Sequence, residues 1–430
     1  MTSLSLLLWI VGGILLQIAA YLALGFWRHW QAYEALRTVA AEFDIAVDPA
    51  AATPEMAPTA VAAWPGYRSF HVERKVLEDA AGLVCSFYLV PEDGKPLPPF
   101  LPGQFLTFQL DIPAPAGGAR TVIRCYSLSD APQPNCYRIS VKRAPSPAGS
   151  THPAGLSSNY FHDHVEVGST LKVRAPGGHF HIDRSDAPVV LIGGGVGITP
   201  MLSMLNWCLV AQPGREVWLF YGVRNRAELV MQKHLADLAA QHPNFYLHMC
   251  LSDPQMDDLA GLRTASIHGH HNRVDVALLR SLLPLKPYHY YICGPTPMLQ
   301  SLVPALEDWG VPDARIHFEA FGPASIPRKN TAPAARTTTP GDDAGAAVMV
   351  TFARSGKQEP WKPDMGSLLD FAEGHGIAVN SGCRAGGCGS CQTSIRSGEV
   401  AYRQAPDFDP EPGSCLLCVC TPRTAVTLEA

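Results

Sequence analysis

The chain has 430 residues, of which 47% are hydrophobic and 17% are charged, and its formal net charge is −5. This length is too great for one hydrophobic core and predicts two to four domains. The acidic balance excludes the basic face that nucleic-acid binding requires, so we expect no nucleic-acid partner. Twelve cysteines are present, half of them from Cys383 onward. Such uneven spacing is unlike a disulfide framework and indicates a reducing compartment with one metal-binding segment.

The first predicted element is a membrane anchor at residues 4–27. This stretch carries no charge, and as a helix it would span roughly 34 Å, against about 30 Å for a bilayer core. A cleaved signal peptide and a buried core helix are the alternatives, but no Lys or Arg precedes the apolar run. Trp27 suits the membrane interface, and Arg28 and Arg37 favour the cytoplasmic side. We therefore expect a retained single-pass anchor in the cytoplasmic membrane, with the soluble domains in the cytoplasm.

The composition and hydrophobic pattern of the sequence divide the rest of the chain into two linkers and three domains. Residues 28–65 predict a juxtamembrane helix and an Ala/Pro-rich linker. Short β-type runs separated by Pro and Gly turns predict an antiparallel β-barrel over 66–185. Alternating apolar strands and helical segments predict a parallel α/β domain over 186–326. A second linker, 327–347, leads to a small cysteine-rich module at 348–430.

A glycine-rich turn follows the first apolar strand of the α/β domain, in "VVLIGGGVGITP". Glycines let a backbone approach a phosphate closely, and the helix that follows offers free N–H groups and a positive dipole end. The turn is not a G-x-G-x-x-G motif, so by itself it is also consistent with a packing turn. The candidate dinucleotide-binding residues of this segment are Gly194, Gly195, Val196, Gly197, Ile198, Thr199 and Pro200.

Further motifs occur in a fixed order around this turn: "PGQFLTF" at 102–108, "RCYSLSDAP" at 124–132, "GLSSNYF" at 155–161, "YYICGPTPM" at 290–298 and "IHFEAFGP" at 316–323. With these motifs in this order, residues 66–325 resemble the ferredoxin–NADP reductase superfamily. The residues within the motifs are similar to those in the reductase half of flavohaemoglobins. The resemblance implies a flavin-binding barrel joined to an NAD(P)-binding domain. It favours FAD as the flavin, with FMN as the second choice.

The resemblance also assigns roles to residues. Tyr126 would lie against the flavin ring, Ser127 would bond it, and Arg124 would pair with a flavin phosphate. Glu319 and Cys293 would lie at the reacting end of the site, beside the flavin edge and the nicotinamide. Other residues implied to bind a cofactor are Phe105, Cys125, Ser157, Ser158, Asn159, Gly294, Pro295, Ala320, Phe321, Gly322 and Pro323.

The choice between NADH and NADPH should depend on the segment after the second α/β strand, "YGVRNRAEL". Arg224 and Arg226 are candidates for holding a 2′-phosphate. Arginines at such a place are also commonly just solvated, so the sequence leaves both coenzymes open.

The C-terminal module contains Cys383-x₄-Cys388-x₂-Cys391, which is the plant-type 2Fe-2S spacing. A four-thiolate zinc site is the alternative, although zinc sites usually pair two short knuckles. Residues 348–430 resemble plant-type ferredoxins, which implies an α+β (β-grasp) fold, and the ending "LLCVCTP" then selects Cys418 as the fourth ligand. Cys415 and Cys420 would be bystanders.

Together these features predict an NAD(P)H-dependent oxidoreductase that resembles the reductase components of oxygenases. Electrons would pass from NAD(P)H through the flavin and the 2Fe-2S cluster to a membrane-associated acceptor, such as an oxygenase, a desaturase or a haem protein. A quinone or ferric reductase is the alternative enzyme. A redox-sensing or structural metal-binding module is the alternative without catalysis.

Overall fold

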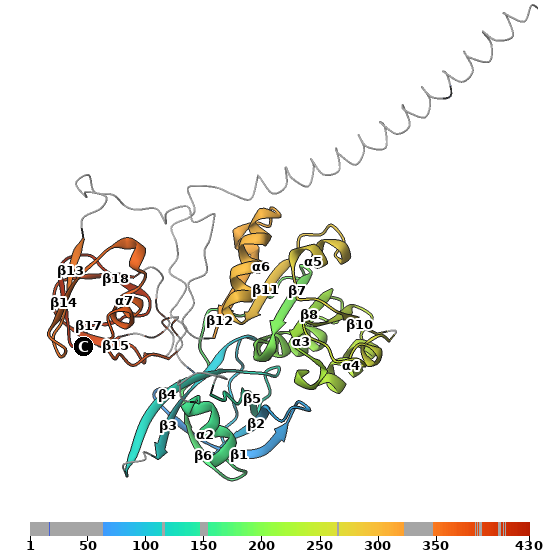
Figure 1. Ribbon diagram of the computed structural model, residues 1–430. Helices are drawn as coiled ribbons and strands as arrows, with labels where there is room; N and C mark the ends of the chain where they lie inside the picture. Colours follow the sequence, from blue (N-terminus) through green and yellow to red (C-terminus); the bar gives the residue numbers. More distant parts are fainter. Residues whose placement is uncertain are drawn as a thin grey trace, which may run out of the picture. The chain divides into compact units, whose positions relative to one another are not determined.

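The computed structural model describes Gln17 and residues 63–113, 117–146, 154–264, 266–321 and 347–430, except 383, 385, 387, 388, 403–405, 407 and 409. Apart from Gln17, every helix and strand that the structure describes lies in one compact unit, Val61–Ala430 (Figure 1). Within the described part of the chain, no helix combines the length and apolarity needed to cross a bilayer. The predicted anchor at 4–27 lies outside the described residues except for Gln17, so it stays a prediction, as does the linker at 327–347 except for its last residue.

The first module is an antiparallel six-stranded sheet in the order β4-β3-β6-β1-β2-β5. An antiparallel bridge between Leu128 and Ile139 brings the two edges together, as the predicted barrel requires. Its interior is apolar, with Phe70, Phe87 and Phe108 fully buried. The strands are β1 (Arg68–Leu77), β2 (Val84–Pro91), β3 (Phe105–Pro113), β4 (Ala119–Ser127), β5 (Tyr137–Lys142) and β6 (Thr170–Val173), with helix α2 (Leu156–His164) between β5 and β6.

The second module is a parallel sheet in the order β10-β9-β8-β7-β11-β12, so the predicted α/β domain is confirmed. Helices α3 and α4 cover one face and α5 and α6 cover the other, which is why every residue of β7 is buried. The strands are β7 (Val189–Gly194), β8 (Val217–Val223), β9 (Phe245–Leu251), β10 (Ile267–His270), β11 (His289–Gly294) and β12 (Ile316–Ala320). The helices are α3 (Ile198–Ala211), α4 (Gln232–Gln241), α5 (Val276–Leu282) and α6 (Thr296–Asp308).

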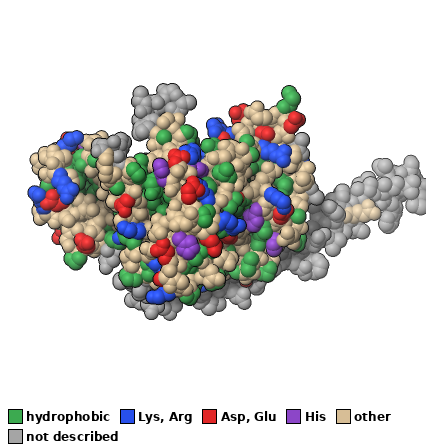
Figure 2. All heavy atoms as spheres, turned by 90° about the horizontal axis from the view of Figure 1, so that it is seen from below, with side chains coloured by type: hydrophobic (Ala, Val, Ile, Leu, Met, Phe, Trp, Pro, Cys, Tyr) green, Lys and Arg blue, Asp and Glu red, His purple; other side chains and the backbone are tan. Residues whose placement is uncertain are grey.

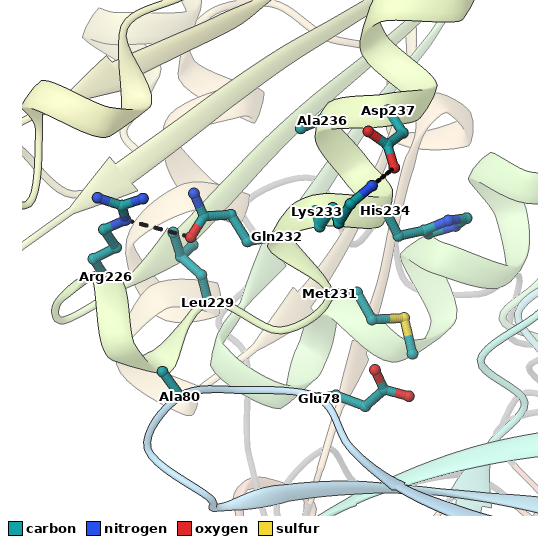
Figure 3. Close-up of a pocket in the computed structure, with 10 residues that line it drawn as sticks. All are labelled: Glu78, Ala80, Arg226, Leu229, Met231, Gln232, Lys233, His234, Ala236 and Asp237. Atoms are coloured by element: carbon teal, nitrogen blue, oxygen red, sulfur yellow. Dashed lines mark hydrogen bonds and ion pairs between the residues drawn. The ribbon is translucent and has the colours of Figure 1, made fainter.

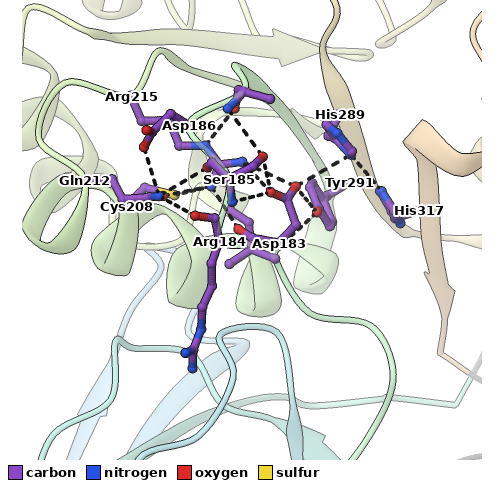
Figure 4. Close-up of polar contacts among 12 residues, drawn as sticks. Asp183, Arg184, Ser185, Asp186, Cys208, Gln212, Arg215, His289, Tyr291 and His317 are labelled. Atoms are coloured by element: carbon purple, nitrogen blue, oxygen red, sulfur yellow. Dashed lines mark hydrogen bonds and ion pairs between the residues drawn. The ribbon is translucent and has the colours of Figure 1, made fainter. Parts of the chain in front are cut away.

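Asp183 fastens the segment that joins the barrel to this sheet (Figure 4). The fully buried Arg215 side chain donates to the Asp183 carbonyl oxygen at 3.0 Å, and the Tyr291 hydroxyl donates to the Asp183 carboxylate at 3.1 Å. His289 lies 3.6 Å from the same carboxylate. These contacts hold the connecting segment near the amino end of β11.

The third module is a mixed five-stranded sheet in the order β14-β13-β19-β15-β17, with a separate β16-β18 ribbon. Its core includes Phe352, Leu368 and Leu416. The predicted α+β module is confirmed. The strands are β13 (Val348–Phe352), β14 (Lys357–Trp361), β15 (Gln392–Ser397), β16 (Val400–Tyr402), β17 (Ser414–Leu416), β18 (Cys420–Pro422) and β19 (Val426–Leu428), with helix α7 (Leu368–Gly374). On the face drawn in Figure 2, cationic and anionic side chains are interspersed.

Candidate functional site

The glycine-rich turn lies where the order of the parallel sheet reverses. The chain runs outward from β7 to β8, β9 and β10 and then returns to β11 on the other side of β7. Ligands of such sheets bind outside the carboxyl ends of the strands at this switch point. A Cβ on Gly197 would lie only 2.1 Å from the Cys293 carbonyl oxygen, and one on Gly194 would lie 2.8 Å from Pro295 Cδ. The turn therefore needs glycine because it is pressed against the end of β11.

Three residues from separate sequence motifs lie side by side here. Strand pairing sets Gly193 of β7 opposite Cys293 of β11, and Cys293 opposite Glu319 of β12. Burial raises the pKa of the Cys293 thiol well above its usual value. Burial also raises the pKa of Glu319 to about 8, and its Oε2 atom is buried without a hydrogen-bond partner among the described residues. The protonated carboxyl group of Glu319 would therefore be able to donate a hydrogen bond or a proton to a ligand bound here.

A cavity of about 390 Å³ opens beside Glu319. Arg124, Cys125, Tyr126 and Ser127, at the carboxyl end of β4, form one wall, and Phe105 of β3, which pairs with Ser127, also lines the cavity. The remaining lining residues are Ser140, Lys142, Val196, Thr199, Glu319, Ala320, Phe321, Ser381, Gly382 and Arg384. The structure thus gathers the predicted flavin segment, part of the glycine turn and the end of β12 around one space.

The aromatic ring of Tyr126 is held in this wall by the barrel core. It meets the rings of Phe161 and Phe108 edge-on, at centroid distances of 5.0 and 5.8 Å. Cys125 is tied to the same wall, with its Sγ 3.4 Å from Thr107 Oγ1. A planar flavin ring fits this donor set, because an aromatic side chain, a hydroxyl, a guanidinium and an unsatisfied carboxyl group face one cavity.

Not every predicted binding residue lines this cavity. Ser157, Ser158 and Asn159 form the first turn of α2. The Ala144 N–H donates to Ser158 Oγ at 3.3 Å, and Asn159 Nδ2 donates to the Ala144 carbonyl oxygen at 3.1 Å. The Ser157 hydroxyl is buried without a partner among the described residues. Their predicted part in cofactor binding stays a prediction, as do the roles of Gly322 and Pro323, which lie outside the described residues.

The two arginines predicted to read the coenzyme ribose are not equivalent. Arg224 directly follows β8, and its Nε donates to Glu228 Oε1 at 2.7 Å, so its charge is already paired. Lys142 of the barrel lies 3.7 Å from the same carboxylate. Arg226 points into a separate cavity of about 800 Å³, where its Nε donates to Gln232 at 3.4 Å (Figure 3). The sequence identified both arginines as candidates but did not reveal that Glu228 pairs with Arg224.

In the third module, two of the predicted cluster ligands are described, and they converge. Cys391 Sγ lies 3.1 Å from Cys418 Sγ, although the two residues are 27 positions apart. Cys383 and Cys388 lie outside the described residues. Gly386 and Gly389 in the same loop have positive φ angles, +76° and +69°, and a Cβ on Gly389 would meet the Phe408 ring at 2.6 Å. A tight glycine-bearing loop with converging thiols fits a 2Fe-2S cluster.

Sequence reasoning missed the part that the third module plays in the flavin cavity. Ser381, Gly382 and Arg384, which flank Cys383, line the cavity together with Arg124 to Ser127. The guanidinium of Arg384 is held to Glu373 of α7 at 2.5 Å. No local pattern signals this, because the two groups of residues are more than 250 positions apart.

Comparison with known proteins agrees with this geometry. Residues 191–303 match the oxidoreductase NAD-binding domain family, and residues 350–423 match the 2Fe-2S iron-sulfur cluster binding domain family. The flavohemoprotein of Halalkalibacterium halodurans is 39% identical over 271 residues, which is 63% of this chain and 63% of that protein. The chain thus spans under two thirds of that relative's length.

The solved FAD/NAD-binding domain of nitric oxide dioxygenase from Vibrio cholerae O1 biovar El Tor is 35% identical. The match covers 60% of this chain and all of that domain, with a TM-score of 0.50. The chain belongs to the ferredoxin–NADP reductase superfamily. As a member, it is an oxidoreductase with sites for FAD and NAD(P)H, and its C-terminal domain is of the 2Fe-2S type. It is also similar to phthalate dioxygenase reductase, at 27% identity over 85% of this chain and 98% of that one, with a TM-score of 0.47.

Proposed function

We propose that this reductase is a membrane-anchored electron-transfer component that takes electrons from NAD(P)H and delivers them to a membrane-associated acceptor. The observation that carries the proposal is the shared cavity. The flavin segment Arg124–Ser127 and the residues on both sides of Cys383 line the same space of about 390 Å³. Electrons that reach a flavin there would be next to the cluster loop.

The residues divide the work. A flavin held by these residues would supply the chemistry that converts a hydride from NAD(P)H into single electrons for a 2Fe-2S cluster. Arg124 and Ser127 would hold and orient the flavin, and Tyr126 would set the plane of its ring. Gly194 and Gly197 would let the coenzyme pyrophosphate approach the amino end of α3. Glu319 would retain a proton near neutral pH and supply it at the cavity wall.

The choice of acceptor rests on the first 27 residues. The uncharged stretch 4–27 would keep the reductase at a bilayer, and confinement there raises the effective concentration of a membrane-bound acceptor. An oxygenase, desaturase or haem protein suits a donor of single electrons. Removing residues 1–30 should release the reductase from the membrane fraction while its NAD(P)H-dependent reduction of a soluble dye persists.

An anaerobic titration followed by visible absorption tests the electron path. NAD(P)H should bleach both flavin bands and the broad iron–sulfur envelope of the full-length protein. Replacing Cys383 with Ser should abolish the envelope and electron delivery to an acceptor while flavin reduction continues. A colourless protein that holds zinc, or a bound flavin that NAD(P)H does not reduce, would contradict the proposal.

A further inference from the structure

One cation of the barrel contacts aromatic rings from two modules. Arg174 follows β6 directly, and its backbone N–H donates to the Thr107 carbonyl at 2.9 Å, which fixes its place on the barrel. Its guanidinium carbon lies 4.9 Å from the ring centre of Tyr67, just before β1, and 4.9 Å from the ring centre of Phe408 in the ferredoxin module. Cations attract the faces of aromatic rings, and Arg does so most often. Arg174 therefore links the barrel to the ferredoxin module.

Phe408 is part of the packing of the cluster loop. Its backbone N–H donates to the Gly386 carbonyl oxygen at 3.0 Å. Its ring occupies the space that a side chain on Gly389 would need, since a Cβ there would lie 2.6 Å from two ring carbons. Gly386 and Gly389 stand on either side of the ligand Cys388. A contact that restrains the Phe408 ring therefore also restrains the loop that carries the predicted cluster ligands.

A second contact holds the other end of this loop. Arg124 Nη1 donates to the Ser381 carbonyl oxygen at 3.4 Å, at the flavin cavity. This hydrogen bond is long and its donor is exposed, so it contributes little by itself. The cation–π contact of Arg174 is therefore the stronger of these two attachments.

We propose that Arg174 is a positioning residue that holds the cluster loop over the flavin cavity by gripping Phe408. This inference rests on the proposed function, because it concerns the step in which one electron leaves the reduced flavin and enters the oxidised cluster. No bond forms or breaks in that step. The contact sets how much of the time the ferredoxin module occupies the arrangement in which the step can occur.

The test uses stopped-flow reduction of the full-length, cofactor-loaded protein by NADH or NADPH, recorded at flavin and cluster wavelengths. In Arg174→Ala the flavin should be reduced at the wild-type rate, while transfer to the cluster slows by between about 2-fold and 30-fold, the range of one cation–π contact. Arg174→Lys should restore part of the rate, and Phe408→Leu should slow the same step. In the double variant Arg174→Ala/Phe408→Leu, electron transfer to the cluster should be no slower than in Arg174→Ala, because both changes remove the same contact between these two side chains.

Arg74→Ala is the matched control. Arg74 lies 3.7 Å above the ring of Tyr88 within the barrel, so this change removes a cation–π contact without touching the ferredoxin module. It should leave the cluster-reduction rate unchanged. Equal rates in wild type and Arg174→Ala, or an equal slowing by Arg74→Ala, would overturn the proposal.

Hydrogen exchange on the same full-length proteins separates this proposal from the proposed function. Segments around Ser381 and Phe408 should exchange faster in Arg174→Ala than in wild type and Arg74→Ala, whether or not NAD(P)H reduces the flavin. Unchanged exchange would show that the contact between Arg174 and Phe408 does not hold the cluster loop, and would overturn this proposal. Failure of the wild-type flavin to be reduced would instead count against the proposed function.

Discussion

The guanidinium of Arg124 lies 3.4 Å from the carbonyl oxygen of Ser381. Arg124 belongs to the predicted flavin segment, and Ser381 stands two residues before the predicted cluster ligand Cys383. This contact joins the flavin end and the cluster end of the proposed electron path, and it makes the arrangement of the modules testable residue by residue.

The fourth cluster ligand can be tested among three neighbouring cysteines. Cys418→Ser should abolish the iron–sulfur absorption and the iron content of the purified protein, because Cys418 Sγ lies 3.1 Å from Sγ of the predicted ligand Cys391. Cys415 is fully buried in the ferredoxin core. Cys415→Ala should keep the cluster, with at most a modest loss of stability. A protein in which Cys415→Ala loses the cluster and Cys418→Ser keeps it would reverse the assignment.

Glu319 should make stability depend on pH. Burial raises its pKa from 4.5 to about 8, so between these values the folded state binds more protons than the unfolded state. The free energy of unfolding of the flavin-free protein should therefore fall as pH rises from about 4.5 to about 8. Glu319→Gln should flatten this part of the profile in urea melts. An unchanged slope in the variant would show that the carboxyl group ionises normally.

Glu228 should decide how well the reductase uses NADPH. Its carboxylate pairs with Arg224 just beyond β8, which removes the cation that a 2′-phosphate would need. We expect the wild type to favour NADH, and Glu228→Gln should raise kcat/KM for NADPH relative to NADH. Asp93→Asn is the control, since it removes the same charge from an ion pair with Arg68 on the barrel. A wild-type preference for NADPH would contradict this expectation.

The glycine turn offers a test of the coenzyme site. Gly197→Ala would set a Cβ 2.1 Å from the Cys293 carbonyl oxygen, so the turn must shift. Flavin reduction by NAD(P)H should fall by tenfold or more, on the order expected for misplaced reactants. Gly214→Ala is the matched control, because its Cβ would meet nothing within 4 Å. Equal activity of both variants with the wild type would remove the turn from the site.

Much of the fold followed from local patterns. The change from period-two runs to alternating strands and helices predicted the barrel and the parallel sheet, because each element buries its own apolar face. The spacing of Cys383, Cys388 and Cys391 indicated the 2Fe-2S module, because a short loop must supply three thiolates. The sequence left Arg224 open as a phosphate ligand, because a local pattern does not say which carboxylate will reach a surface cation.

The sequence by itself determined the three modules, their order and the residue types of each cofactor site, since these depend on neighbours along the chain. The tertiary structure decided which sites meet. Only the folded chain sets Gly193, Cys293 and Glu319 in one row, brings Ser381 to Arg124 and places Phe408 over Arg174. Such contacts join residues 26 to more than 250 positions apart, and they form only when strand pairing and module packing bring distant segments together.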